Sequence, residues 1–225
     1  MKNPFQDFGG YEPKIRELPL DKMVKDKREV MSKLLKGYAR LLTAGKKDFV
    51  WLVQNETVER AYRAAEAAIN GTKYDMGDIE EFCYSIETVD DLPYKVTGPL
   101  GIYISALINY AKEDSITLNL VDLKMDISLI GFRLPKGKTL TINGDVGDFT
   151  GMGVDGGTMT VNGNAKNWTG AGMKRGTIEI KEKAGYHTGE WMTGGEISVG
   201  TRVRGLGDSM YGRVYENGKL IFPVS

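Results

Sequence analysis

The sequence predicts a mainly β protein, in which a helical N-terminal region precedes a right-handed parallel β-helix (a solenoid) of about five turns. Three observations support this fold class. The chain of 225 residues holds 29 glycines, which are sparse before residue 95 and dense from 131 to 218. The glycine-rich part repeats itself at a short fixed period, and each repeat opens with alternating apolar and polar residues. We therefore expect two parts, a helical region with a capping helix (1–113) and the β-helix with a C-terminal cap (114–225).

The first expected helix covers residues 21–44. Its apolar residues recur at intervals of three and four with charges between them, which is typical of an amphipathic helix. Asp21 is suited to the N-cap, and Gly45 is suited to the helix end. The apolar face either packs against the rest of the protein or provides a docking face for a partner.

Three further helices are expected, in parts of 48–70, near 77–86 and from about 99 to 113. The last is mostly apolar, with Pro99 in its first turn, and must be buried on most sides. Cys83 lies in an apolar run without a second cysteine nearby, which favours a small buried side chain over a reactive thiol.

The repeats are three consecutive blocks of 19 residues, at 139–157, 158–176 and 177–195. A fourth block starts at Glu196, and a looser copy covers about 115–138. The pairs that open the four regular blocks alternate inward-facing residues with polar ones: Leu140/Ile142, Met159/Val161, Ile178/Ile180 and Ile197/Val199. Two further apolar columns follow, Val146/Ala165/Ala184/Val203 and Val154/Met173/Met192. No helical stretch separates the strands, so stacked coils are predicted rather than βαβ units.

The glycines are expected at corners of the coils. There they adopt positive φ or permit close approach between turns, and Asn143 and Asn162, which precede glycines at one corner, also tolerate the left-handed region. The segment GMGVDGG at 151–157 has the glycine spacing of a dinucleotide-binding turn, but no helix follows it. It is therefore interpreted as one corner of one coil.

Both ends of a solenoid need a cover, because they present unpaired strand edges and apolar core. The helix at 99–113 is expected to cap the first turn. A hairpin around Asn217-Gly218, within 213–225, is expected to close the last turn.

Composition limits the classes of partner. The 30 basic and 30 acidic side chains balance, so nucleic acid is not expected, and a single cysteine excludes a multi-cysteine metal site. Without an apolar run of signal-peptide or membrane-spanning length, a cytoplasmic protein without membrane contact is expected.

Catalytic residues are scarce. His187 is the only histidine, and its column also holds Phe149, Trp168 and Leu206, which favours a ring stacked in the core or just beneath the surface. Ser209, in Gly207-Asp208-Ser209, resembles a hydrolase nucleophile, but no matching acidic partner of the histidine is evident. A hydrolase that uses Ser209 and His187 remains an alternative. No catalytic, cofactor-binding or metal-ligating residue is assigned.

The spacing Gly144-x-x-Gly147-x-x-x-Gly151 resembles the signature of the GXGXG domain family, and the resemblance covers about 115–212. This domain is the right-handed β-helix at the C-terminal end of glutamate synthase large subunits, and a similar domain forms one of the subunits of formylmethanofuran dehydrogenase. Lys166 replaces the middle glycine of the second block and Glu182 the first glycine of the third. The repeat glycines carried by the resemblance are Gly144, Gly147, Gly151, Gly163, Gly170, Gly185 and Gly189.

The resemblance implies a rigid scaffold, with amidotransferase, flavin or metal chemistry carried by other subunits, as in the split glutamate synthases of some archaea. The chain is thus expected to be a non-catalytic subunit of a glutamate-synthase-like (amidotransferase and FMN) or formylmethanofuran-dehydrogenase-like oxidoreductase complex, with no cofactor of its own. Besides the hydrolase, a homo-oligomeric β-helix without a different partner is the remaining alternative.

Overall fold

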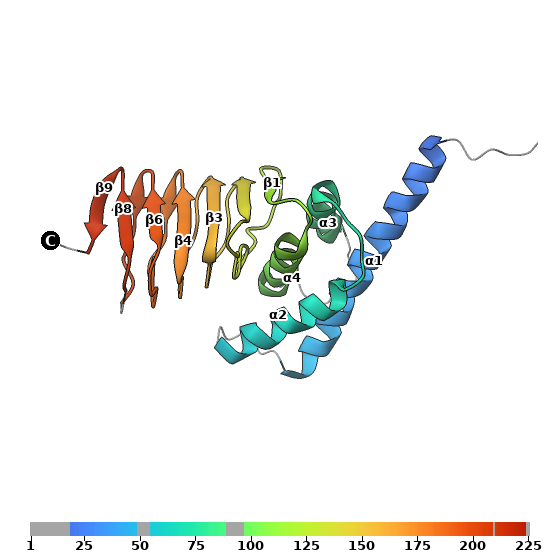
Figure 1. Cartoon of the computed structure of the whole chain (residues 1–225), viewed down its shortest axis with the longest axis horizontal. Coiled ribbons are helices and arrows are strands. Elements are labelled where there is room, and N and C mark those ends of the chain that lie inside the picture. The colour runs from blue at the N-terminus through green and yellow to red at the C-terminus, as the bar shows by residue number, and fades with distance from the viewer. Residues whose placement is uncertain (1–18, 49–54, 89–96, 209, 224–225) are drawn as a thin grey trace, which may run out of the picture.

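The computed structural model describes residues 19–48, 55–88, 97–208 and 210–223 (Figure 1). Its helices are α1 (Pro19–Asp48), α2 (Asn55–Ile69), α3 (Met76–Thr88) and α4 (Thr97–Tyr110). Its strands are β1 (Ser115–Asn119), β2 (Thr139–Asn143), β3 (Asp155–Asn162), β4 (Arg175–Ile180), β5 (Lys183–Ala184), β6 (Glu196–Val199), β7 (Arg202–Val203), β8 (Arg213–Glu216) and β9 (Lys219–Phe222). The helices gather at one end of a row of stacked strands (Figure 1).

The strands confirm a parallel β-helix. The main sheet has the order β1-β2-β3-β4-β6-β8-β9, and all of its neighbours are parallel except β8 and β9. Each regular block pairs with the next at a separation of 19 residues, as Thr139 pairs with Thr158 and Thr158 with Thr177. The solenoid has about four turns, slightly fewer than expected.

The predicted inward columns form the solenoid core. All eight residues of the opening pairs, from Leu140 to Val199, are fully buried. Val154, Met173 and Met192 are also fully buried, whereas Val203, in the fourth block, is only partly buried. Burial of this many apolar side chains, each contributing roughly 1.5–3 kcal/mol, is the main force that holds the coils together.

Helix α4 caps the first coil, as predicted, although it ends at Tyr110 rather than near 113. The hydroxyl of the buried Ser105 accepts a hydrogen bond from the backbone N–H of Phe132 at 3.0 Å. Asn109 Nδ2 donates to the Phe132 carbonyl at 3.0 Å. Gly101 permits this close approach, because a Cβ there would lie 1.8 Å from the Ser128 carbonyl oxygen. The cap is therefore joined to the solenoid by polar contacts as well as apolar packing.

The other helices pack around α4. Tyr38 of α1, Phe82 of α3 and Tyr103 of α4 form an aromatic cluster with centroid distances of 5.3–5.7 Å. The Tyr103 hydroxyl donates to the Leu34 carbonyl at 3.0 Å, and burial raises the Tyr103 pKa. Helix α1 extends past the expected stop at Gly45 to Asp48. None of the four helices in the described ranges combines the length and apolar character needed to cross a membrane.

The C-terminal hairpin has the predicted form. Strands β8 and β9 are antiparallel, and Asn217 and Gly218 between them both have positive φ, as a tight two-residue turn requires. Strand β9 covers the edge of the last parallel strand.

Asn143 and Asn162 do not use the left-handed region that asparagine tolerates. Their side chains instead form a ladder on the outside of the sheet. Asn143 Nδ2 donates to Asn119 Oδ1 at 2.6 Å, and Asn162 Nδ2 donates to Asn143 Oδ1 at 2.7 Å. Parallel strands in register place identical side chains one above the other, and an amide pairs well with a copy of itself.

Candidate functional site

The glycine motif serves contacts between coils. Gly144 and Gly151 have positive φ, whereas Gly147 does not. A Cβ at Gly147 would lie 2.4 Å from the Ser128 hydroxyl in the coil before it. At Gly163 and Gly185, which also lack positive φ, a Cβ would lie 2.3 Å from the Gly144 carbonyl oxygen and 2.5 Å from Asn167 Oδ1. The seven repeat glycines thus divide into corner residues with positive φ (Gly144, Gly151, Gly170 and Gly189) and residues that only permit close approach (Gly147, Gly163 and Gly185).

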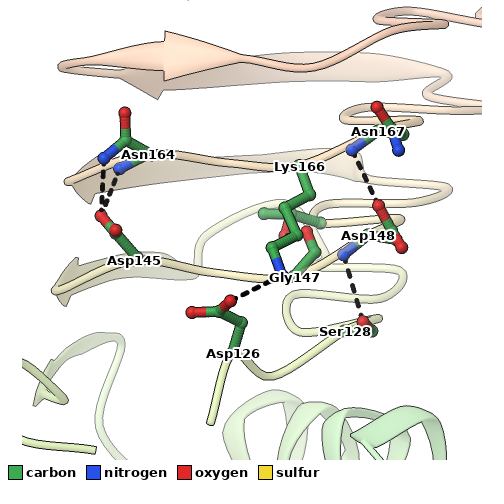
Figure 2. Close-up of polar contacts among 9 residues, drawn as sticks. Asp126, Ser128, Asp145, Gly147, Asp148, Asn164, Lys166 and Asn167 are labelled. Carbon is green, nitrogen blue, oxygen red and sulfur yellow. Dashed lines mark hydrogen bonds and ion pairs between the residues drawn. The ribbon is translucent and has the colours of Figure 1, made fainter. Parts of the chain in front are cut away.

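Lys166 fits the motif because Gly147 below it has no side chain. Its backbone N–H donates to the Gly147 carbonyl, and its side chain passes Gly147 to reach Asp126 (Figure 2). Lys166 Nζ lies 2.7 Å from Asp126 Oδ2, and hydrogen bonding to that carboxylate raises the pKa of Lys166. One side chain thereby ties a coil to the segment two coils earlier.

The other polar groups of the motif also join neighbouring coils (Figure 2). Asp145 Oδ1 accepts hydrogen bonds from the backbone and side-chain amides of Asn164 at 2.7 and 3.0 Å. Asp148 Oδ1 accepts from the Asn167 backbone at 2.9 Å, and its own N–H donates to Ser128 Oγ at 3.1 Å. These carboxylates and amides are used within the solenoid, which is what a structural repeat requires.

A buried threonine column escaped the sequence interpretation. Thr150, Thr169 and Thr188 are fully buried, and each hydroxyl donates to the carbonyl three residues before it, at 2.9–3.1 Å. The signal was present, since threonine occupies the same column in three successive blocks. The local hydrogen bond satisfies the hydroxyl and lets a polar side chain lie in the core.

The expected stack around His187 is confirmed, but the His187 side chain is 48% exposed rather than beneath the surface. Phe149 and Trp168 are stacked at 4.8 Å, and Trp168 and His187 at 5.0 Å, with ring planes within 6°. All three have φ near +58°, a region that non-glycine residues rarely adopt. Stacking of aromatic rings, worth about 0.5–1.5 kcal/mol per pair, offsets part of the backbone strain.

His187 has an acidic partner that the sequence interpretation missed. Its Nδ1 lies 2.9 Å from Oε2 of the buried Glu190, three residues later at the same corner. Such a carboxylate orients an imidazole and leaves Nε2 to accept a proton. Ser209, the nucleophile of the hydrolase alternative, lies outside the described residues. Within the described ranges, the ring nitrogens of His187 have no hydrogen-bond partner other than Glu190.

Cys83 has the predicted environment. Its thiol is fully buried in α3, and burial raises its pKa to about 12, so the thiolate is absent at neutral pH. Among the described residues, no three His, Cys, Asp or Glu side chains gather as metal ligands would.

The strongest candidate for a binding surface is the N-terminal half of α1. This half extends beyond the other helices (Figure 1). A groove of about 740 Å³ runs along it, lined by Leu20, Met23, Val24, Lys27, Arg28, Met31, Ser32, Leu35, Lys36 and Glu81. Leu20 and Met23 are 68% and 64% exposed, an unusual extent for large apolar side chains on one helix face. We call these ten residues the α1 groove.

The α1 groove is held in place by α3. Asp75 and Asp78 form a reciprocal cap at the start of α3, with hydrogen bonds of 3.0 and 2.9 Å. Asp78 Oδ1 also lies 3.3 Å from Lys27 Nζ, and this carboxylate raises the Lys27 pKa. The two helices are therefore linked beside the groove.

Comparison of the chain with protein-family models, curated proteins and solved structures finds no match.

Proposed function

We propose that this protein is a non-catalytic structural subunit that holds a partner protein within a larger enzyme complex. The observation that carries the proposal is the α1 groove, where Leu20, Met23 and Val24 remain exposed on a helix that extends from the body. The N-terminal half of α1 belongs to a helix of 30 residues and leaves large apolar side chains in contact with water. A partner that covers the apolar face would stabilise it.

The rest of the fold suits a rigid mount. The C-terminal half of α1 packs through the buried Leu34, Tyr38 and Leu41, and α4 joins the helices to the first coil. A partner bound at the α1 groove would thus be connected to the solenoid through packed elements. The inter-coil contacts around Lys166 and Asp145 make the solenoid a stiff body.

From the resemblance to the GXGXG domain we propose the kind of complex. It is either a glutamate-synthase-like assembly with amidotransferase and FMN subunits or a formylmethanofuran-dehydrogenase-like assembly. The resemblance rests on the spacing of Gly144, Gly147 and Gly151 together with the period of 19 residues and the apolar columns. The structural use of these glycines is consistent with a scaffold and requires no ligand.

Native affinity purification of the tagged chain from its own host, followed by mass spectrometry, tests the proposal. Amidotransferase, flavin or molybdenum/tungsten subunits are expected in stoichiometric amounts. The double variant Leu20→Asp/Met23→Asp should lose them, whereas Val121→Asp, at another exposed apolar residue, should retain them. Recovery of the chain alone, as a monomer or homo-oligomer by light scattering, would overturn the proposal.

The hydrolase is the second candidate, favoured by the His187–Glu190 pair. It requires that His187→Ala and Ser209→Ala each abolish hydrolysis of an activated ester by the purified protein. The structural proposal expects no such activity in the unchanged protein, and a lower unfolding midpoint for His187→Ala because the aromatic stack loses a ring.

A further inference from the structure

The α1 groove carries charged side chains beside its apolar stripe. The stripe runs from Leu20 to Leu35, about 22 Å along the helix. Lys27 and Arg28 lie halfway along it, and Lys36 lies at its C-terminal end. Glu81 of α3 supplies the single acidic side chain of the lining. Because Lys27 already pairs with Asp78, Arg28 and Lys36 mainly determine the sign that a bound partner meets.

A second copy of this chain is a poor occupant. In a twofold-symmetric pair, residues near the axis meet their own copies. An axis at the centre of the stripe would bring Lys27 and Arg28 against the same cations, which costs free energy. An axis placed elsewhere would leave part of the apolar stripe uncovered.

An anionic membrane is also less suitable. A helix that lies on a bilayer needs an apolar face that stands clear of acidic groups. Here Glu81 lies in the lining and Asp78 lies 3.3 Å from Lys27, so a bilayer that covered the stripe would also meet α3 and its carboxylates. A single helix can instead direct its acidic residues to Arg28 and Lys36 alone.

Building on the proposed function, we infer that the α1 groove binds an amphipathic helix of a partner protein, whose apolar face is flanked by acidic residues opposite Arg28 and Lys36. Leu20, Met23, Val24, Met31 and Leu35 would contact the apolar anchors of that helix at intervals of three and four residues. The flexible methionines adapt to the shapes of these anchors. Arg28 and Lys36 would pair with the acidic flanks.

The test uses two fluorescent synthetic helices of equal length with identical leucine faces, one flanked by Glu and the other by Lys. Binding to the full-length chain is measured by fluorescence anisotropy at low and high salt. The Glu-flanked helix should bind at least about tenfold more tightly at low salt, and the difference should shrink at high salt. Equal binding of the two helices, or tighter binding of the Lys-flanked helix, would overturn the inference.

Charge reversal locates the contact. Arg28→Glu combined with Lys36→Glu should reverse the preference, so that the Lys-flanked helix binds better. Both side chains are exposed, so the fold should be retained, and circular dichroism checks this. Arg202→Glu, at an exposed site on β7, is the matched control and should change nothing. The chain should not bind vesicles that contain phosphatidylserine. If it does bind them, and Leu20→Asp/Met23→Asp abolishes this binding, the groove is a membrane-binding surface and the inference falls.

The two proposals fail separately. If native purification recovers partner subunits but the double charge reversal leaves the complex intact, the structural function stands and the acidic-helix inference falls. If purification recovers the chain alone while the Glu-flanked helix binds, the groove has the inferred chemistry but the complex is wrong.

Discussion

The β-helix and the helical region differ in how completely they bury their apolar residues. In the β-helix, the inward columns of one regular block are repeated in the next, and Ile142, Val161 and Ile180 are all fully buried. In α1, one periodic apolar stripe is buried in its C-terminal half and exposed in its N-terminal half. Leu34 and Leu41 are buried, whereas Leu20 and Met23 are exposed. In a repeat, the same apolar positions recur in several blocks, so the sequence itself shows which residues face inward. A single amphipathic helix shows only that it has an apolar face and not what that face packs against.

The largest expected effect separates the two halves of α1. Leu34→Ala removes a fully buried side chain and should lower the free energy of unfolding by about 3 kcal/mol. Leu20→Ala removes the same atoms from an exposed site and should change it by less than about 0.5 kcal/mol. Urea unfolding of both variants measures the difference. Equal losses would mean that Leu20 is covered within the isolated chain.

The next effect tests the junction of the two regions. Gly101→Ala places a Cβ against the Ser128 carbonyl oxygen and should cost about 3 kcal/mol, because α4 must move off the first coil. In Gly71→Ala the new Cβ meets no atom within 4 Å, but the residue has φ of +76°, so about 1 kcal/mol of backbone strain is expected. If both variants lose the same amount by thermal unfolding, the close approach of α4 is not important for stability.

A smaller effect is expected within the solenoid. Asn143→Ala removes the middle of the asparagine ladder and should cost about 1 kcal/mol, since both of its side-chain bonds are lost. A double-mutant cycle with Asn119→Ala isolates the bond between the two residues. A coupling energy of zero would show that this bond contributes nothing to stability.

The smallest effect concerns the bridge between Lys166 and Asp126. Both side chains are more than a third exposed, so Lys166→Met should cost only a few tenths of a kcal/mol. The folded-state pKa of Lys166 is raised above its ordinary 10.5. The contribution is therefore fully present below that value and is lost as the pH rises through the raised pKa. Unfolding of both proteins at pH 7 and above pH 10.5 checks this, and a difference that grows with pH would contradict it.

Sequence reasoning predicted the features that repetition or local chemistry specifies. The period of 19 residues fixed the register of the strands, and Asn217-Gly218 indicated the closing hairpin. The apolar helix before the first block was predicted to cap it, and α4 does so. Each of these features depends on residues close in sequence or on a pattern that several blocks share.

The missed features depend on single contacts. No general rule places a carboxylate three residues after a histidine at a coil corner, so Glu190 was not foreseen. The bridge from Lys166 to Asp126 links a regular block with the irregular first one, where the repeat gives no register. Positive φ at Phe149, Trp168 and His187 contradicts the usual preference for glycine, and the stacking of their rings between coils was visible only in the structure.

The constant register of the middle coils has a consequence for the dimensions of the protein. Helix α4 closes one end of the solenoid and strand β9 closes the other. The coils lie between them and keep them apart (Figure 1). Duplicating the block 158–176 would insert one coil and separate the two closures by about 4.8 Å more, with no new end to protect. The length of the solenoid can thus change in equal steps, by whole coils, through evolution or design. Such a change leaves the binding surfaces at either end as they are.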